Sequence, residues 1–209
     1  MADIELIGSP QSNYVRAIRM LCMEKGVAIR NTSARPHAPE VTAIHPAGQI
    51  PCLRHGDVTL FESLAIATYI DKAFPGPKFI PEDALGAARV MQWTSYGNVK
   101  VDRWVMREFV VLIAFADKAK GPDMARVTAA MPEIEKCLSA LEAASAKTGY
   151  LAGTGLTFAD INVLPMLTAL QFYPAGAEQM AKHPALEAYV AKLAARPSYT
   201  STAPPPRKL

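Results

Sequence analysis

Two serines lie between the first expected strand and the first expected helix, where a hydroxyl group could assist chemistry at sulfur. Residues 8–16 have the sequence GSPQSNYVR, with the serines at positions 9 and 12. A serine in this place can simply cap the helix by accepting one of its first backbone N–H groups. Alternatively, Ser9 or Ser12 donates a hydrogen bond to a thiolate at the positive end of the helix, which lowers the thiol pKa and makes the sulfur nucleophilic.

A proline stands at the start of an expected strand in residues 48–53, whose sequence is GQIPCL. Proline donates no hydrogen bond to a sheet, so the first residue of a strand suits it. A cis bond before Pro51 would turn the backbone N–H and C=O of Ile50 away from the sheet and towards a ligand. Because cis is the minority form of such bonds, spacing alone favours an ordinary trans proline.

Glu62 and Ser63 stand at the start of the helix that follows an expected hairpin. In a purely structural role they would cap the helix and compensate its dipole. In a binding role the helix N–H groups and the Ser63 hydroxyl would hold a carboxylate, while Glu62 would pair with an ammonium group. Taken singly, the pair favours the structural role.

Alternating and helical spacings of apolar residues predict the elements that position these motifs. Strands are expected at residues 3–7, 27–31, 51–55 and 58–61, and helices at 14–25 and 63–71. Residues 32–48 hold three prolines and are expected to form a loop with at most one short helix. The order of elements is therefore β-α-β followed by β-β-α.

The sequence changes character after residues 74–83, which carry three prolines in ten positions. Neither a helix nor a central strand tolerates that density, so this stretch is expected to be a linker. Beyond it, helical periodicity appears in residues 84–117, 123–147, 157–172 and 184–195. The expected division is a first domain in 1–74, a linker in 75–83, an all-helical domain in 84–202 and a poorly ordered tail in 203–209.

The 209 residues carry a formal net charge of +3, with both signs mixed along the chain. Because no block of lysines and arginines is present, neither nucleic acid nor an anionic membrane is expected as a partner. Three cysteines without a C-x-x-C pair favour a reducing compartment, and hence a cytoplasmic location. Residues 1–7 lack the features of a signal peptide, and the apolar stretch 109–116 is too short to span a bilayer.

In their order and spacing, the three motifs resemble those of the cytosolic glutathione transferases, and the likeness extends over nearly the full length. Residues 48–51 are similar to the loop before the family's cis-proline, and Glu62 with Ser63 is similar to its acidic residue and serine for the γ-glutamyl group. The resemblance implies a fold of class α/β + all-α: a thioredoxin-like N-terminal domain with a four-stranded mixed sheet, followed by an all-helical C-terminal domain.

By the same resemblance, five residues of the first domain bind glutathione. The main chain of Ile50, before Pro51 in cis, holds the cysteinyl part through antiparallel hydrogen bonds. Gln49 reaches the glycyl end, while Glu62 and Ser63 hold the γ-glutamyl ammonium and carboxylate.

Two histidines belong to the same region of the sequence. His37 is a second candidate partner for the glycyl carboxylate, and a solvated loop histidine is the alternative. His45 stands where the family often has an asparagine before Pro-x-Gly, which leaves the details of that turn open.

The residue that activates the thiol is expected to be Ser12, with Ser9 and Tyr14 as alternatives. Residues 9–12 are similar to the C-P-x-C motif of glutaredoxins with both cysteines replaced by serine, so disulfide chemistry is not expected there. Counted back from residues 24–26 at the end of the helix, Ser12 falls where theta-like and tau-like members of the family place their catalytic serine.

In the second domain, residues 156–161 resemble the family's capping box, in which Thr157 and Asp160 satisfy each other's N–H groups. The electrophile pocket is expected between residues 9–14 and the first long helix of this domain. Its candidate lining residues are Tyr96, Arg103, Trp104 and Arg107. The alternative is that the aromatic residues of this helix belong to the core.

The predicted function is that of a glutathione transferase, a detoxification enzyme that uses glutathione as co-substrate and no metal. The glutathione thiolate would attack a small electrophile, in conjugation, dehalogenation, isomerisation or peroxide reduction, and the resemblance implies a homodimer. One alternative is a non-catalytic glutathione-binding or protein-interaction module of the same fold. Another is a disulfide reductase or peroxidase, which serine at positions 9 and 12 disfavours.

Overall fold

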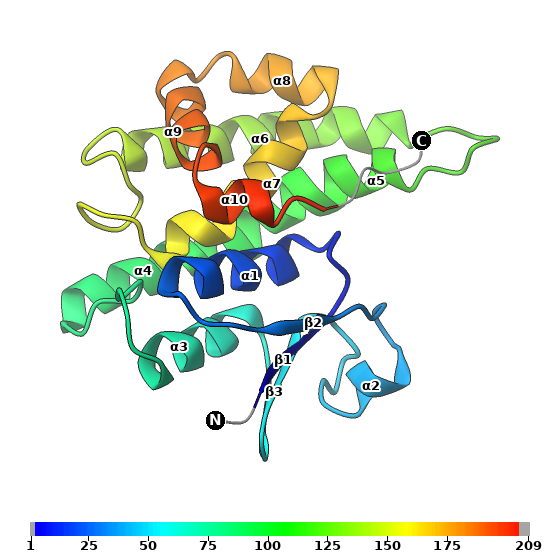
Figure 1. Ribbon diagram of the computed structural model, residues 1–209. Coiled ribbons are helices and arrows are strands. Elements are labelled where there is room, and N and C mark those ends of the chain that lie inside the picture. Colours follow the sequence, from blue (N-terminus) through cyan, green and yellow to red (C-terminus); the bar gives the residue numbers. More distant parts are fainter. Residues whose placement is uncertain (1–2, 205–209) are drawn as a thin grey trace. The chain divides into compact units, whose positions relative to one another are not determined.

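The computed structural model of the chain describes residues 3–204, which fall into two compact units (Figure 1). The first unit runs to Ile80 and takes in the segment from Ala195 onwards, and the second unit is Pro81–Ala194. Of the tail expected at 203–209, residues 205–209 lie outside the described part of the chain.

The first unit is built on a four-stranded mixed sheet, as predicted. Its strands are β1 (Ile4–Ile7), β2 (Arg30–Thr32), β3 (Cys52–His55) and β4 (Val58–Phe61), in the order β2-β1-β3-β4. β1 runs parallel to β2 and antiparallel to β3, which pairs antiparallel with β4. The second strand begins later than expected, because the Val27 N–H donates to the Cys22 carbonyl and completes the end of the preceding helix at Gly26.

Helices cover both faces of this sheet (Figure 1). They are α1 (Asn13–Lys25), α2 (Pro39–Thr42) and α3 (Ser63–Ala73). The short helix α2 packs on one face, against Ile7 and Cys52. Neighbouring residues of a strand point to opposite faces, so Leu6 and Leu53, a fully buried pair across β1 and β3, point to the other face. On that side α1 and α3 pack against each other.

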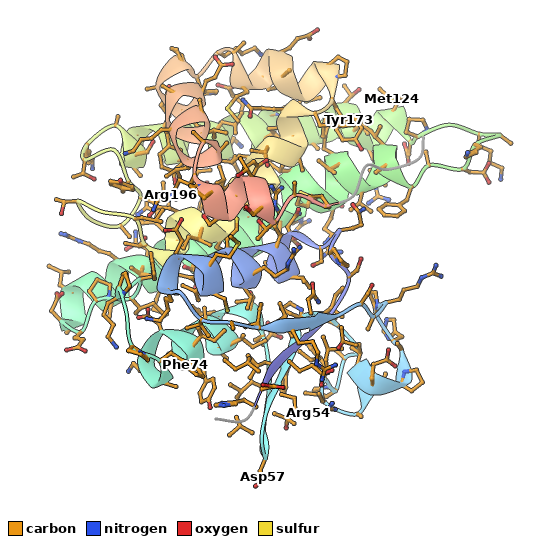
Figure 2. The ribbon with its side chains drawn as sticks, in the orientation of Figure 1. Arg54, Asp57, Phe74, Met124, Tyr173 and Arg196 are labelled. Carbon is orange, nitrogen blue, oxygen red and sulfur yellow. The ribbon has the colours of Figure 1, made fainter. Side chains whose placement is uncertain are left out.

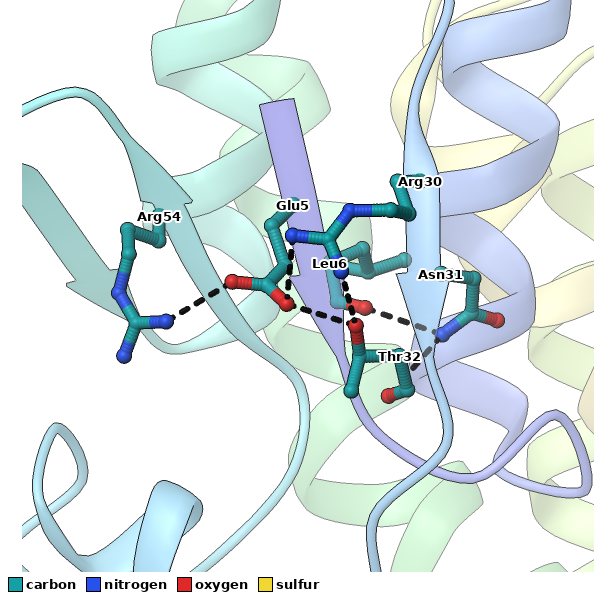
Figure 3. Close-up of polar contacts among 6 residues, drawn as sticks. All are labelled: Glu5, Leu6, Arg30, Asn31, Thr32 and Arg54. Atoms are coloured by element: carbon teal, nitrogen blue, oxygen red, sulfur yellow. Dashed lines mark hydrogen bonds and ion pairs between the residues drawn. The ribbon is translucent and has the colours of Figure 1, made fainter. Parts of the chain in front are cut away.

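A carboxylate ties three strands of the sheet together (Figure 3). Glu5 on β1 accepts a hydrogen bond from the Thr32 hydroxyl on β2 at 2.6 Å. Its oxygens also pair with Arg30 of β2 at 3.1 Å and with Arg54 of β3 at 2.8 Å. The Thr32 hydrogen bond and the two guanidinium groups lower the pKa of Glu5 against the opposing effect of burial. A shift of β2 or β3 against β1 would move these partners away from Glu5, so the network favours the observed strand register.

A buried ion pair joins the ends of α1 and α3 to the chain that follows them. Lys25 Nζ lies 3.2 Å from Asp71 Oδ1, and both side chains are almost fully buried. The Asp71 carboxylate also accepts the backbone N–H groups of Phe79 and Ile80 at 3.0 and 3.1 Å. The Lys25 ammonium in turn donates to the Pro77 carbonyl at 2.8 Å. Both charges are therefore compensated, and the proline-rich stretch is held against the two helices.

The chain returns to the first unit at its C-terminal end, where residues 196–202 form what we call the C-terminal clamp. Arg196, labelled in Figure 2, stands at the start of helix α10 (Pro197–Ser201). It donates two hydrogen bonds to the Glu24 carboxylate on α1, at 2.7 and 2.6 Å. The Ser198 hydroxyl donates to the same carboxylate. These hydrogen bonds, that from Arg196 foremost, lower the pKa of Glu24.

Two arginines of α1 complete the contact with the clamp. Arg16 donates to the Tyr199 carbonyl at 2.9 Å and lies over the Tyr199 ring, 3.8 Å from its centroid. Arg19 donates to the Thr202 carbonyl at 3.3 Å. Both carbonyls lie at the C-terminal end of α10, where helix carbonyls lack partners and cations are favoured.

The second unit consists mainly of helices. They are α4 (Ala84–Tyr96), η1 (Gly97–Val110), α5 (Val111–Ala114), α6 (Met124–Ser145), α7 (Phe158–Gln171), α8 (Pro174–Met180) and α9 (Pro184–Ala194). Each segment predicted to be helical after residue 83 forms helix over most of its length. Within residues 3–204, no helix combines the length and the apolar character needed to cross a membrane.

Two helices of this unit differ from the sequence-based expectation. The middle of the segment 84–117 is a π-helix, and the Val111 N–H bonds to the Met106 carbonyl rather than to a residue four positions back. The helix α8 lies between the segments 157–172 and 184–195 that were expected to be helical, and Pro174 begins it. Proline is accepted there because the first residues of a helix need no N–H for the helix itself.

The predicted capping box at the start of α7 is confirmed. Asp160 is fully buried, and its carboxylate accepts the N–H and the hydroxyl of Thr157 at 2.8 and 2.7 Å. Two donors that the local sequence does not indicate also reach it: the Leu151 N–H and the Tyr189 hydroxyl of α9, each at 2.8 Å. A buried charge requires such partners, so Asp160 joins α7, α9 and the preceding loop.

Replacing Tyr189 by phenylalanine tests how much this carboxylate depends on its partners. Tyr189→Phe is expected to lower the free energy of unfolding by about 1.5–3 kcal/mol, the range for a hydrogen bond to a charged group. Tyr69→Phe is the comparison, because it removes a hydrogen bond between the Tyr69 hydroxyl and His55 Nδ1, which involves no carboxylate, and should cost about 0.5–1.5 kcal/mol. Denaturant unfolding of both variants measures the difference, and equal losses would contradict the expectation.

Candidate functional site

The two candidate serines both lie at the N-terminus of α1. Ser12 is the N-cap residue, and its Oγ accepts the Val15 N–H at 3.4 Å. The Oγ of Ser9 accepts the Gln11 N–H at 3.3 Å. Each contact uses a lone pair of the oxygen, so the structural role leaves the hydroxyl hydrogen for a ligand. Tyr14, the third candidate, is half-buried in the first turn of the helix.

The proline loop lies directly against this helix start. The bond between Ile50 and Pro51 is cis, the form that the family resemblance implies and that spacing alone disfavours. Gly8 marks the approach of the two segments. A Cβ added there would lie 3.2 Å from the Ile50 Cβ and 2.5 Å from the Val15 side chain. Only glycine leaves the room that this approach needs, and its φ of +155° also favours glycine.

The candidate glycyl-binding residues are also neighbours. The His37 N–H donates to the Gly48 carbonyl at 2.8 Å. The His37 ring lies so close to Gly48 that an added Cβ would come within 2.4 Å of Nδ1. Both residues have left-handed backbones, with φ of 64° and 63°. The exposed side chain of His37 and the exposed Gln49 therefore flank one stretch of backbone.

The candidate γ-glutamyl residues begin α3. Glu62 precedes the helix with φ of 67° and ψ of 120°, and its side chain makes no capping hydrogen bond. The structure thus disagrees with a capping role for Glu62, and its side chain is 65 % exposed. Ser63 is the first helical residue and is buried. Across from them, His45 Nε2 lies 3.6 Å from Glu62 Oε1.

One loop therefore gathers the predicted glutathione residues of the first unit. Ile50 lies against Gly8, Gly48 lies against His37, and His45 faces Glu62. The three motifs, far apart in sequence, meet around residues 45–51, with a helix N-terminus on either side. Helix N-termini and exposed backbone N–H groups suit an anionic ligand, and Glu62 adds a partner for an ammonium group.

The candidate pocket residue Tyr96 turns towards α6. Its hydroxyl hydrogen-bonds with the Cys137 thiol, and burial, more than the neighbouring thiol and Glu133, raises the pKa of Tyr96 to about 12. Its ring meets that of Trp93 edge-on, with centroids 5.5 Å apart. Both rings are half-buried, in keeping with the alternative that aromatic residues of this helix contribute to the core.

The other candidate pocket residues lie on the π-helix η1. The Arg103 guanidinium lies over the Trp104 ring, 4.6 Å from its centroid. Arg107 donates from Nε to Asp102 at 3.0 Å, and its side chain is 60 % exposed. The π-helical backbone changes which residues share a face, and nothing in the local sequence indicates it. The role of these residues in an electrophile pocket stays a prediction.

The thiols of Cys22, Cys52 and Cys137 are all buried. Burial raises the pKa of Cys22 to about 12 and that of Cys52 to about 11. It also raises the pKa of Cys137. Because a thiolate is the reactive form, these residues are poor nucleophiles, which disfavours a disulfide-exchange mechanism.

The thiols of the folded protein are expected to resist glutathione disulfide. At pH 8 a thiol with the pKa of Cys52, about 11, is ionised in about one molecule in a thousand. Intact mass measured after incubation should therefore be unchanged, whereas protein unfolded in denaturant should gain glutathione adducts. A stoichiometric glutathione adduct on the folded protein would contradict the expectation and favour a redox function.

The architecture defines the class of the protein: a thioredoxin-like domain followed by an all-helical domain. Residues 6–78 match the family model described as glutathione S-transferase, N-terminal domain, and residues 104–197 match glutathione S-transferase, C-terminal domain. Glutathione S-transferase 3 of Zea mays is 32 % identical over 220 residues, covering 99 % of this chain and 98 % of that protein. The chain belongs to the glutathione S-transferase family.

Solved structures agree with this assignment. A structure titled glutathione S-transferase III in apo form superposes with a TM-score of 0.85 at 30 % identity, covering 99 % of this chain and 100 % of that one. Glutathione S-transferase-I bound with the ligand lactoylglutathione superposes with a TM-score of 0.86 at 26 % identity, covering 97 % and 99 %. The theta-like or tau-like, serine-type character of the site stays a prediction.

Proposed function

We propose that this glutathione transferase activates the thiol of glutathione with the hydroxyl of Ser12 and directs the thiolate at a small electrophile. The observation that carries the proposal is the contact between Gly8 and Ile50. It sets the backbone proposed to hold the cysteinyl part of glutathione beside the helix that Ser12 caps.

The energetics of thiolate formation fit these groups. Lowering a thiol pKa by two units takes about 2.7 kcal/mol of preferential stabilisation of the anion. A hydrogen bond from Ser12 to a charged acceptor contributes about 1.5–3 kcal/mol, and the end of the α1 dipole adds about 0.3–1 kcal/mol. Together the two groups cover the requirement.

In the proposed reaction the thiol proton leaves to solvent and the Ser12 O–H donates to the sulfur anion. The sulfur then uses a lone pair to form a C–S bond with the electrophilic carbon. In a substitution the leaving group departs with the bonding electron pair, and in an addition the adjacent carbon takes a proton from water. The backbone of Ile50 and the pair Glu62 and Ser63 hold the peptide while this happens.

Two measurements test the proposal. The protein should be retained on immobilised glutathione and eluted by free glutathione, and it should conjugate glutathione to an aryl chloride such as 1-chloro-2,4-dinitrobenzene. Retention without turnover for aryl halides, activated alkenes, epoxides and hydroperoxides would favour the non-catalytic module. If the protein neither binds to immobilised glutathione nor catalyses conjugation, glutathione is not its substrate and the proposal is wrong.

We also propose the oligomeric state, the cellular location and the biological role of the enzyme. A homodimer formed through the helical domains, a cytoplasmic location and a role in detoxification are typical of the family. Sedimentation of the purified protein tests the first of these, since a monomer at micromolar concentration would contradict it.

A further inference from the structure

His45 is a buried histidine whose Nδ1 is hydrogen-bonded and whose Nε2 faces a carboxylate. Its Nδ1 lies 3.1 Å from the Ala47 backbone nitrogen, which can only donate. Nδ1 therefore accepts, and the proton of the neutral ring is on Nε2. The hydrogen bond to Ala47 thus selects the tautomer and fixes the direction in which the ring can donate.

The proton on Nε2 faces the carboxylate of Glu62. The distance from Nε2 to Oε1 is 3.6 Å, and the ring rests against Phe61 with centroids 4.7 Å apart. Within residues 3–204, no other donor side chain pairs with the Glu62 carboxylate. The Phe61 contact and the Ala47 hydrogen bond leave the imidazole little freedom to turn away.

The backbone of His45 belongs to the proline loop. Its N–H donates to the Val41 carbonyl at 2.7 Å, and its carbonyl accepts the Gly48 N–H at 2.9 Å. The residue is therefore anchored between α2 and the turn that leads to Ile50. Through its ring it connects this turn to the start of α3, so it links the two parts of the first unit that hold opposite ends of the proposed ligand.

We infer that His45 is a positioning residue that aims the Glu62 carboxylate at the ammonium group of the γ-glutamyl moiety, an inference that rests on the proposed function. The Nε2 proton faces one carboxylate oxygen at 3.6 Å and favours rotamers of Glu62 that keep it there. Glu62 has a left-handed backbone and an exposed side chain, so without this restraint its carboxylate would sample several rotamers. His45 thereby contributes to discrimination between peptides with and without an ammonium group at this end.

The test compares glutathione with glutaryl-cysteinylglycine, which differs only in lacking the ammonium group. For His45→Ala we expect the dissociation constant of glutathione to rise about tenfold, as for loss of one contact to a charged group. The inhibition constant of the glutaryl analogue against conjugation should stay within about twofold, because the analogue makes no use of the aimed carboxylate. KM for glutathione should rise and kcat should be retained.

Two further variants separate positioning from support of the loop. His45→Asn keeps an acceptor for the Ala47 N–H and a donor towards Glu62, so it should restore most of the affinity. In a Glu62→Gln background His45→Ala should add little, because the charged group it acts through is gone. His55→Ala, on the outer end of β3, is the control that should leave both ligands unaffected.

The outcomes distinguish this inference from the proposed function. If the unmodified protein fails to bind glutathione, the proposed function falls. If it binds glutathione but His45→Ala weakens both ligands equally, or weakens neither, His45 does not aim Glu62 and the inference is overturned.

Discussion

Ser12→Ala is expected to lower the rate of conjugation about 100-fold while the affinity for glutathione changes less than about threefold. The factor corresponds to losing about 2.7 kcal/mol of thiolate stabilisation, two units of thiol pKa. Glutathione binding should survive because the backbone of Ile50 and the residues at the start of α3 remain. The measurements are kcat/KM with an aryl chloride and calorimetric titration with glutathione.

The pH profile of the same variant gives a second readout. If the Ser12 hydroxyl stabilises the thiolate, its removal raises the pKa of bound glutathione, so the rise of rate with pH moves to higher pH. Ser12→Thr keeps a hydroxyl and a helix cap and should retain most of the activity. Unchanged turnover in Ser12→Ala would transfer the role to Ser9 or Tyr14, which the corresponding Ala and Phe variants would then reveal.

Asp71→Ala is expected to destabilise the protein by about 3–5 kcal/mol, because it leaves the Lys25 ammonium buried without its partner. Two backbone N–H groups, those of Phe79 and Ile80, lose their acceptor at the same time. Denaturant unfolding measures the loss, and a variant that fails to accumulate in folded form at 25 °C agrees with it.

The matched control for Asp71 is an exposed ion pair on α6. Glu133→Ala removes the partner of Lys136, whose side chain is 69 % exposed, and should cost less than about 1 kcal/mol. A double variant, Lys25→Met with Asp71→Leu, should recover part of the stability lost in Asp71→Ala, because it leaves no unpaired buried charge. Similar losses for Asp71→Ala and Glu133→Ala would contradict the assigned role of the buried pair.

Much of the fold could be predicted because its signals are local. Apolar spacing located the helix that begins at Ser63, and the capping box at Thr157 and Asp160 is readable three residues apart. The cis bond before Pro51 came from the family resemblance, since spacing alone favours trans. The short helix α8 was missed for a local reason as well: a proline interrupts a helical pattern, but it is also accepted as the first residue of a new helix.

The contacts of the site could not be predicted, because they join residues that are distant in the chain. Nothing near His45 in the sequence indicates that its ring faces Glu62. The same holds in the sheet, where the sequence of β1 does not indicate that Glu5 contacts Arg30 and Arg54. The local sequence does not indicate the π-helix η1 either. For the same reason the residues of the expected electrophile pocket could be named from the sequence, but not their orientations.

The C-terminal clamp has a consequence for how the protein is made. The partners of Arg16, Arg19 and Glu24 are encoded beyond the whole helical unit, so translation must pass through that unit before they emerge from the ribosome. Until then the thioredoxin-like sheet and its helices carry an incomplete surface on α1. The contacts of the first unit are therefore completed late in synthesis, when residues 196–202 fold back onto α1.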